Sequence, residues 1–416
     1  MTEMRATAAV DIQPRFSLAR RVVLKLLGEI RVGRLTLIDG PQQQVFGGSQ
    51  DGPSATIVVN RDVAYTRVLR SGVTGAGEAF FEGDWDTPDL TAVVRLFVLN
   101  RKTMQTMNGG LARAGRVLHR LWHWARRNSV AGSKRNISAH YDISNAFFET
   151  ILDESMMYSS ALFHSDSDSL AQAQQNKLAR LCELLDLQPG DHVLEIGTGW
   201  GGLAEYAATH HDVVVTTTTI SRAQFNYAKA RIARSGLEGR VHLLDSDYRA
   251  LTGRYDKIVS VEMIEAVGEE HLPTFFKTCN DLLRPGGRLV LQAITIPDAY
   301  YDDYRRSTDF IQRYVFPGGF LPSLGAMERI MHRDTALQIA TVDDIGLHYA
   351  KTLRVWHDKL IAARSAVSSF GFDERLYRLW RYYFSYCEGG FAEQAISTVH
   401  LVANKSDGGG AVDGAT

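Results

Sequence analysis

The middle of the chain alternates between strand-like and helix-like segments, and this alternation constrains the fold more than any other feature. It runs from about residue 165 to residue 297. The strand-like runs are HVLEIG, DVVVTTTTI, RVHLLDSD, YDKIVSVEMI and GRLVLQAITI, and helix-like stretches separate all of them except the third and fourth. Strands that alternate with helices at this spacing build βαβ units. The pattern therefore predicts an α/β fold with a parallel, doubly wound, Rossmann-like sheet.

The segment before the sheet predicts a small α+β domain at residues 1–104. It contains an amphipathic stretch from Leu18 to Leu35 and two strand-like runs, at 35–39 and 55–60, with a Gly/Gln-rich loop between them. A basic segment at 105–136 follows, which we interpret as a helical linker.

The sheet domain is predicted to span residues 137–405. A Tyr- and Arg-rich helical insertion is expected at about 298–333, and two strand candidates, 336–346 and 396–405, are expected to add an edge pair to the sheet. The Gly-rich residues 406–416 are expected to form a disordered tail.

Composition limits the class of protein. The chain has 3 cysteines, Cys182, Cys279 and Cys387, which are far apart and favour a reducing, cytoplasmic location over a disulfide framework or a thiolate metal cage. No apolar run approaches the roughly 18 to 20 residues that a membrane-spanning helix requires. The histidines lack metal-ligand spacing, so we predict no metal site.

Charge is distributed unevenly along the chain. Residues 90–141 carry 10 basic side chains and no acidic one, interleaved with Leu and Trp. Such a stretch is typical of a helix that lies on an anionic membrane surface. A solvated basic face, an inter-domain helix or a nucleic-acid contact would explain the charge as well.

A glycine-rich loop ends the first strand of the alternating region. In VLEIGTGWGG, Gly197, Gly199 and Gly201 allow a tight turn and a close approach to a ligand at the carboxyl end of the strands. Glu195 lies inside the strand. The second strand ends in Thr219, Ile220 and Ser221 rather than in the acid with which NAD enzymes hold a ribose.

The loop resembles the S-adenosylmethionine loop of class I methyltransferases, in which the acid lies near the methionine ammonium group. Further motifs narrow the resemblance. They are HYDISNAFFETILDESMMYSSALF at 140–163, TISRAQ at 219–224, VSVEMIEAVGEEHL at 259–272, YVFPGGFLPS at 314–323, HYAKTL at 348–353 and YCEGGF at 386–391. In this order they resemble the cyclopropane-fatty-acyl-phospholipid synthases and mycolic acid cyclopropane synthases, over roughly residues 136–405.

The resemblance implies S-adenosylmethionine as cofactor and the cis double bond of a phospholipid acyl chain as substrate. The residues that it implies around the cofactor are Tyr158, Ser159, Glu195, Gly197, Gly199, Gly201, Thr219, Ile220, Gln224, Asp247 and Tyr248. Gln224 would contact the ribose, and Asp247 and Tyr248 would neighbour the adenine.

The resemblance also implies a catalytic centre that holds bicarbonate as a base. Its matching positions are Ser160, Glu265, Gln292, Ile294 and Tyr349. The family has Cys where this chain has Ser160, and His where it has Gln292. A glutamine amide donates a hydrogen bond but cannot carry a positive charge or shuttle a proton. Either a modified site holds the anion, or the cation formed on the acyl chain is quenched differently.

Aromatic faces stabilise cations, and the candidates near this centre are Phe147, Phe148, Tyr301, Tyr304, Tyr314 and Phe316. Each of them is also an ordinary candidate for the hydrophobic core.

Three functions remain open. The leading one is formation of cyclopropane fatty acids on unsaturated phospholipids by an enzyme bound peripherally to the inner face of the membrane. The alternatives are a methylene- or methyl-branched product from the same substrate, and a small-molecule methyltransferase. A lipid surface is preferred to nucleic acid as the partner of residues 90–141, and a homodimer is expected by analogy with the family.

Overall fold

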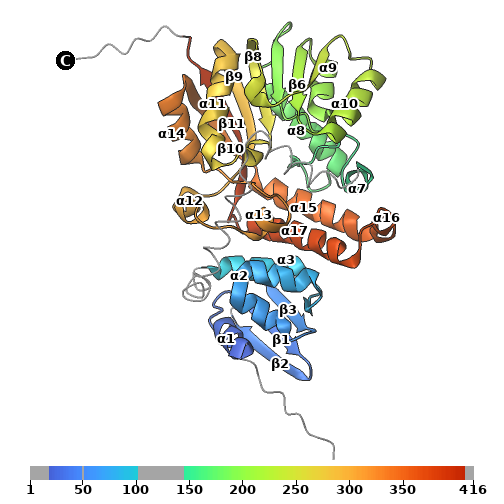
Figure 1. Ribbon diagram of the computed structural model, residues 1–416, viewed down its shortest axis with the longest axis vertical. Helices are drawn as coiled ribbons and strands as arrows, with labels where there is room; N and C mark the ends of the chain where they lie inside the picture. Colours follow the sequence, from blue (N-terminus) through green and yellow to red (C-terminus); the bar gives the residue numbers. More distant parts are fainter. Residues whose placement is uncertain (1–17, 49–50, 102–144, 408–416) are drawn as a thin grey trace, which may run out of the picture.

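The computed structural model describes residues 18–48, 51–101 and 145–407, which lie in three tiers (Figure 1). A small N-terminal body forms one end, a large sheet with its helices forms the other, and helices from the C-terminal third lie between them. The predicted linker at 105–136 and residues 408–416 of the predicted tail lie outside the described residues. The domain boundaries placed there therefore stay predictions.

The N-terminal body combines helices with a four-stranded sheet of order β2-β1-β3-β4. Its elements are α1 (Leu18–Leu27), β1 (Arg34–Asp39), β2 (Gln42–Gly47), β3 (Ser54–Val59), α2 (Val63–Phe81), β4 (Trp85–Asp86) and α3 (Leu90–Leu99).

Two predictions for this body are wrong. The amphipathic helix ends at Leu27, and Leu35 is a buried residue of β1. The predicted Gly/Gln-rich loop contains β2, which pairs antiparallel with β1 across a turn at Gly40 (φ 56°). The side chains of β2 are mostly exposed and polar. The strand therefore shows no clear apolar alternation, and its backbone hydrogen bonds to β1, together with the packing of Phe46 on the core, place it in the sheet.

The large sheet confirms the predicted α/β fold. Its seven strands have the order β10-β11-β9-β8-β5-β6-β7. They are β5 (His192–Ile196), β6 (Val214–Thr219), β7 (Val241–Asp245), β8 (Tyr255–Val261), β9 (Leu283–Thr295), β10 (Leu337–Asp344) and β11 (Ser397–Lys405). Neighbours from β9 to β7 are parallel, whereas β11 and β10 join antiparallel beside β9, as the two strand candidates predicted.

Successive residues of the central strands enter two different cores, because side chains alternate across a sheet. On β9, Leu289 and Leu291 pack in one core and Val290 packs in the other. The first core is covered by α11 (Leu272–Leu282) and α14 (Leu324–Asp334). The second is covered by α8 (Leu170–Leu185), α9 (Gly202–His210) and α10 (Arg222–Arg234). Helices on both faces bury most of the apolar residues of the parallel strands.

The middle tier lies across the carboxyl ends of the strands (Figure 1). Its helices are α7 (Asn145–Ile151), α12 (Asp298–Tyr304), α13 (Phe310–Tyr314), α15 (Gly346–Ala362), α16 (Arg364–Ser369) and α17 (Glu374–Ala392). The insertion predicted at about 298–333 is thus three separate helices, α12, α13 and α14, rather than a long one. Pro317, two glycines and Pro322 separate α13 from α14, because proline cannot continue a helix.

The N-terminal body docks on α17. The buried guanidinium of Arg378 donates to the carbonyls of Phe80 (2.7 Å) and Trp85 (2.9 Å), and Thr91 donates to the Glu388 carboxylate (2.9 Å). These contacts join residues almost 300 positions apart, so the first and last parts of the chain form one end of the cavity described below.

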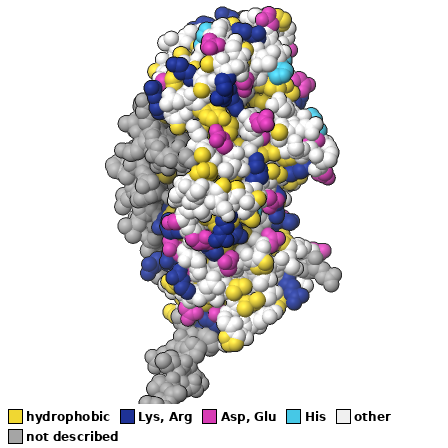
Figure 2. Space-filling model, turned by 90° about the vertical axis from the view of Figure 1, so that its right-hand side faces the viewer, with side chains coloured by type: hydrophobic (Ala, Val, Ile, Leu, Met, Phe, Trp, Pro, Cys, Tyr) yellow, Lys and Arg dark blue, Asp and Glu magenta, His cyan; other side chains and the backbone are white. Residues whose placement is uncertain are grey.

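Basic and acidic side chains are interspersed on the described surface that Figure 2 shows. No helix among the described residues is long and apolar enough to span a bilayer.

Candidate active site

A cavity of about 500 Å³ opens between the carboxyl ends of β5, β6 and β8 and the middle tier. One end is formed by the glycine-rich loop and the residues that follow β6 and β7. The other end is apolar and includes Ile311, Leu353, Phe391 and, from the N-terminal body, Val98. The cavity therefore connects a polar loop of the Rossmann sheet with a chamber that can hold hydrocarbon.

The three loop glycines differ in what their lack of a side chain allows. Gly197 (φ 102°) and Gly199 (φ 53°) line the cavity, and a Cβ at Gly199 would meet no atom within 4 Å. Gly201 (φ 88°) does not line it. A Cβ there would lie 3.2 Å from Ala228 on α10, so Gly201 begins α9 and allows the two helices to pack closely.

Glu195 lies beneath the loop and lines the cavity from β5. Its Oε2 accepts a hydrogen bond from Thr217 Oγ1 (2.5 Å). Burial raises the pKa of Glu195 to about 8, against the opposing effects of that hydrogen bond and of the charge on Lys177.

The ends of β6 and β7 supply the remaining polar residues. Thr219 Oγ1 donates to Gln224 Oε1 (3.1 Å), and Ile220 lies between them in the cavity wall. Asp247 also lines the cavity, but its carboxylate accepts from Arg249 Nε (2.8 Å) and Nη2 (2.7 Å). Tyr248 lies beside it, with its ring edge on Phe275.

This half of the cavity fits S-adenosylmethionine. Backbone without Cβ atoms, a buried acid, an amide and an aromatic wall match the phosphate-free nucleoside and amino-acid ends of that molecule. Tyr158 and Ser159 line the same cavity from the segment before α8.

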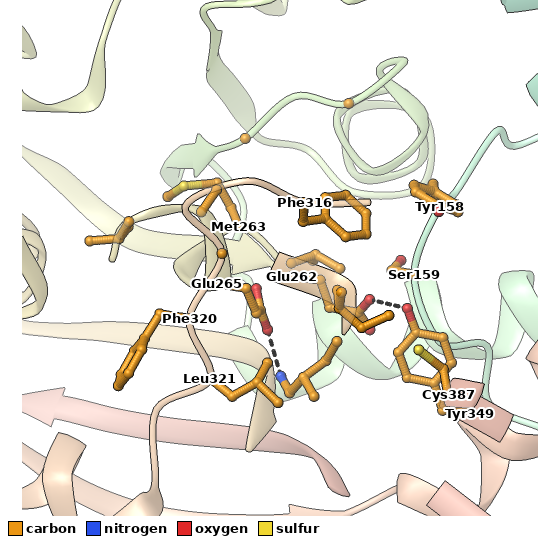
Figure 3. Close-up of a pocket in the computed structure, with 18 of the residues that line it drawn as sticks. Tyr158, Ser159, Glu262, Met263, Glu265, Phe316, Phe320, Leu321, Tyr349 and Cys387 are labelled. Carbon is orange, nitrogen blue, oxygen red and sulfur yellow. Dashed lines mark hydrogen bonds between the residues drawn. The ribbon is translucent and has the colours of Figure 1, made fainter. Parts of the chain in front are cut away.

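The apolar half contains only some of the predicted aromatic residues. Tyr304 and Phe316 line the cavity, together with Phe320 and Leu321, which were not predicted (Figure 3). The other four candidates belong to the core instead. Phe147 stacks on Phe372 at 4.6 Å, and the Tyr314 hydroxyl donates to Glu78. Phe148 and Tyr301 are likewise buried away from the cavity.

A carboxylate that sequence reasoning missed lies at the junction of the two halves. Glu262 follows the last residue of β8 and lines the cavity. Its Oε1 accepts from Ser160 N (2.9 Å) and from Gln292 Nε2 (2.7 Å), and its Oε2 accepts from the Tyr349 hydroxyl (2.7 Å; Figure 3). The signal available in the sequence was an acid at the carboxyl end of a central parallel strand, where ligands of such sheets bind.

Glu265 lies one turn further on and also lines the cavity. Its Oε1 accepts from Ile294 N (2.6 Å), whereas its buried Oε2 has no hydrogen-bond partner among the described residues. Burial, reinforced by the nearby charge of Glu262, raises the pKa of Glu265 to about 8. At neutral pH Glu265 is therefore mainly protonated and can donate a hydrogen bond into the cavity.

The five predicted catalytic positions thus come together, and three of them, Glu265, Ile294 and Tyr349, line the cavity. Gln292 and Ser160 are completely buried and do not line the cavity. Gln292 Nε2 also reaches Ser160 O (3.1 Å), and its Oε1 contacts His400 Nε2 (3.0 Å). The Glu262 carboxylate accepts hydrogen bonds from both residues and lines the cavity. It therefore lies at the position for which the sequence predicted an external anion.

The backbone of Glu262 is strained. Its φ of 47° lies in the left-handed region, which costs a residue other than glycine about 1–3 kcal/mol. Such strain persists where the surrounding structure over-determines it. Here the Glu262 N–H donates to Gln292 O (2.8 Å), which joins β8 and β9 at the point where the carboxylate turns inward.

Comparison with known proteins agrees with this geometry. Residues 129–401 match the family described as mycolic acid cyclopropane synthetase. The chain is 36% identical to the tuberculostearic acid methyltransferase UfaA1 of Mycobacterium tuberculosis, over 83% of this chain and 82% of that one. It is 33% identical to the cyclopropane-fatty-acyl-phospholipid synthase of Escherichia coli K12, over 84% and 88%.

Among solved structures, the mycolic acid cyclopropane synthase CmaA1, in complex with SAH and CTAB, superposes with a TM-score of 0.62 at 30% identity. The match covers 65% of this chain and 98% of that one. The chain therefore belongs to the mycolic acid cyclopropane synthetase family, and it is a class I, S-adenosylmethionine-dependent methyltransferase of the cyclopropane-fatty-acyl-phospholipid synthase type.

Proposed function

We propose that this enzyme adds a one-carbon unit across the cis double bond of an unsaturated phospholipid acyl chain and forms a cyclopropane fatty acid. The observation that carries the proposal is the single cavity that runs from the glycine-rich loop to an apolar chamber, with two carboxyl groups at the junction. S-adenosylmethionine, when bound, supplies an electrophilic methyl group on sulfur.

The chain's own residues hold an alkene against that methyl group and keep water out. The π electrons of the alkene form the new C–C bond, while the electrons of the S–C bond leave with sulfur. The neighbouring alkene carbon is left positive. Tyr304 and Phe316 present aromatic rings to this chamber and are suited to stabilise the cation.

Ring closure requires a base. A proton leaves the transferred methyl carbon, and the electrons of its C–H bond form the third side of the cyclopropane ring. A carboxylate at the junction of the two halves of the cavity is placed for this step.

A methylene-branched product is the second candidate, and the names of relatives favour it. Besides UfaA1, a protein of Pseudomonas putida named as a probable fatty acid methyltransferase is 34% identical over 89% of this chain. In this variant a hydride first shifts to the positive carbon. Loss of a proton from the transferred methyl carbon then gives a methylene group, C=CH2, on the acyl chain, and this product has the same mass as the cyclopropane.

The basic stretch at 90–141 is the proposed membrane contact. Two of its ten basic residues are described, and both are engaged within the molecule. Arg95 pairs with Glu393 (2.6 Å), and Arg101 donates to the Tyr300 hydroxyl (2.9 Å). The other eight lie outside the described residues. Each would contribute about 1 kcal/mol at an anionic surface. The cytoplasmic location, the inner membrane face and a homodimer stay predictions.

Liposomes test the proposal. The full-length protein is incubated with S-adenosylmethionine labelled in its methyl group and with vesicles of an unsaturated phospholipid, and the lipid is then extracted. We expect label in the acyl chains, and none with vesicles of saturated phospholipid. Proton NMR separates the cyclopropane ring methylene from the olefinic C=CH2 protons of a methylene-branched chain. Absence of label from unsaturated lipid would refute the proposed function.

A further inference from the structure

We propose that the Glu262 side chain provides, from within the chain, the anion that the family resemblance assigns to bicarbonate, and that it accepts the proton lost from the transferred methyl carbon. This inference rests on the proposed function. It would make the enzyme independent of dissolved bicarbonate.

The donors around this position leave no place for an added anion. Three positions that the resemblance assigns to the bicarbonate site, Ser160, Gln292 and Tyr349, donate to Glu262 through a backbone N–H, a side-chain amide and a hydroxyl group. The fourth, Ile294 N–H, donates to Glu265. Bicarbonate would have to displace a covalently attached carboxylate and lie beside a second carboxyl group. The residues present do not fit it.

The hydrogen bonds also define which oxygen can react. An ionised carboxylate has about four acceptor sites, two on each oxygen. Oε1 of Glu262 uses both of its sites, on Ser160 N and Gln292 Nε2, whereas Oε2 accepts one hydrogen bond, from Tyr349. One site on Oε2 therefore remains for the proton from the methyl carbon. The broken C–H bond leaves its electrons to the ring bond, and the proton is released to water after the product leaves.

More hydrogen-bond donors surround the carboxyl group of Glu262 than that of Glu265. Burial raises the pKa of Glu262, but three hydrogen-bond donors and the positive charge of Lys177 oppose this effect. Lys177 is completely buried and donates to Ser159 Oγ (2.8 Å), next to Ser160. Glu265 has a single backbone donor and a pKa of about 8. Of the two acids, Glu262 accepts the greater number of hydrogen bonds, which stabilise a carboxylate, and proton acceptance is therefore assigned to it.

The strained backbone supports a function for this side chain. Glycine would adopt the φ of 47° at Glu262 without strain, so nothing in the turn itself calls for glutamate. Unlike the backbone hydrogen bond to Gln292, which glycine would keep, the three hydrogen bonds of the carboxylate require glutamate at this position.

Glu262→Gly is the most informative variant, because it relieves the strain, removes the carboxylate and leaves its donors in place. We expect wild-type turnover to be unchanged in buffer freed of carbon dioxide. We expect E262G to lose on the order of 10²-fold or more in kcat, since general-base catalysis contributes about 10²–10⁴. Added bicarbonate, formate or acetate should restore part of the lost turnover.

A binding measurement provides a readout that does not depend on lipid turnover. Isothermal titration and ¹³C NMR with labelled bicarbonate should show saturable binding to E262G and none to the wild type. If the wild type labels no lipid, the proposed function fails, but this comparison still tests whether Glu262 occupies an anion site.

Two further variants separate chemistry from folding. Asp186→Gly is the matched control, because Asp186 has a similar φ of 53° and an exposed carboxylate at the end of α8, outside the cavity. It should keep wild-type activity. Glu262→Gln keeps the size of the side chain but not its basicity, and it should lose turnover while S-adenosylmethionine affinity stays within a few fold.

The inference is overturned if wild-type turnover requires bicarbonate, or if folded E262Q retains turnover within a few fold. It is also overturned if E262G binds the cofactor and none of the three carboxylates restores any activity.

Discussion

Single buried acids determine how this site titrates, and Glu265 is the clearest case. Its ordinary pKa of 4.5 is raised to about 8 in the folded chain, because the carboxyl group is buried and faces the charge of Glu262. The protonated form is therefore the stable one over most of the physiological range. A group of this kind can orient a reacting molecule with its proton, whereas it is a poor base near neutrality.

Glu265→Gln keeps a hydrogen-bond donor in place of the protonated carboxyl group, so turnover should fall by less than the roughly 10²-fold expected for loss of a base, and cofactor affinity should change less than about twofold. Its stability should depend on pH in a defined direction. Because the pKa of Glu265 is higher in the folded chain (about 8) than in the unfolded chain (about 4.5), its protonation stabilises the folded state. This stabilisation is complete below about pH 4.5 and is lost as the pH rises through about 8. Glutamine does not titrate.

The free energy of unfolding of E265Q should therefore rise relative to that of the wild type between pH 5 and pH 8, by up to roughly 1.4 kcal/mol per pH unit. The difference in melting temperature between the two proteins should follow the same direction. Thermal unfolding at several pH values measures this difference. A constant difference across the range would show that Glu265 is not the buried titrating acid.

Gln224 tests the cofactor half of the cavity at the same scale. Its side chain is 7% exposed, lines the cavity and accepts from Thr219. Loss of a polar contact costs about 1–1.5 kcal/mol, so Gln224→Ala should weaken S-adenosylmethionine binding about tenfold. Isothermal titration provides the measurement. Gln175→Ala, on the exposed side of α8, should leave the affinity unchanged; equal affinity for both variants would remove Gln224 from the site.

At the scale of elements, the contact between α3 and α17 closes the apolar end of the cavity. Val98 reaches the cavity from α3, and α17 contributes Tyr383, Tyr386 and Cys387. Close approach of the two helices depends on Gly389. A Cβ there would lie 2.6 Å from Val94 Cγ1 and 2.9 Å from Val94 Cβ, so α3 would have to move.

Gly389→Ala should lower the free energy of unfolding by about 1–3 kcal/mol, because overpacking outweighs the better helix propensity of alanine. Gly390→Ala is the matched control. A Cβ at Gly390 would lie 3.4 Å from Ile396, an ordinary contact, so this variant should be neutral or slightly more stable. Denaturant unfolding compares the two. Equal stability would mean that the helices do not pack as described.

At the scale of the whole molecule, the proposed membrane contact differs from the rest of the surface in its distribution of charge. The basic stretch at 90–141 contains no acid, whereas the surface in Figure 2 mixes both signs. Attraction between surface charges is screened over about 8–10 Å at physiological salt, and over less at higher salt.

Co-sedimentation with anionic liposomes should therefore weaken steeply as salt is raised from about 0.05 M to about 0.5 M. Replacing Arg126 and Arg127 with glutamine should weaken it at low salt. The same change at Lys229 and Arg234, which are exposed on α10, should have little effect. Liposome binding that changes neither with the salt concentration nor with replacement of Arg126 and Arg127 would contradict the proposed membrane contact.

The sequence by itself determined the Rossmann-like sheet, its antiparallel edge pair, the glycine-rich loop and the family. These features depend on local patterns. Buried parallel strands require apolar runs, the turns between β5 and α9 require glycine, and both leave a signal within a few residues.

Tertiary structure alone decided which side chains meet at the junction of the cavity. Glu262 bonds to residues 102, 30 and 87 positions away. No periodicity in the chain records such contacts, because they arise when β8, β9 and α15 pack together. For the same reason four aromatic candidates proved to be core residues, and β2 became a strand without an apolar pattern. A local pattern specifies an element, whereas a site is made by side chains that only the packed fold brings within hydrogen-bond distance.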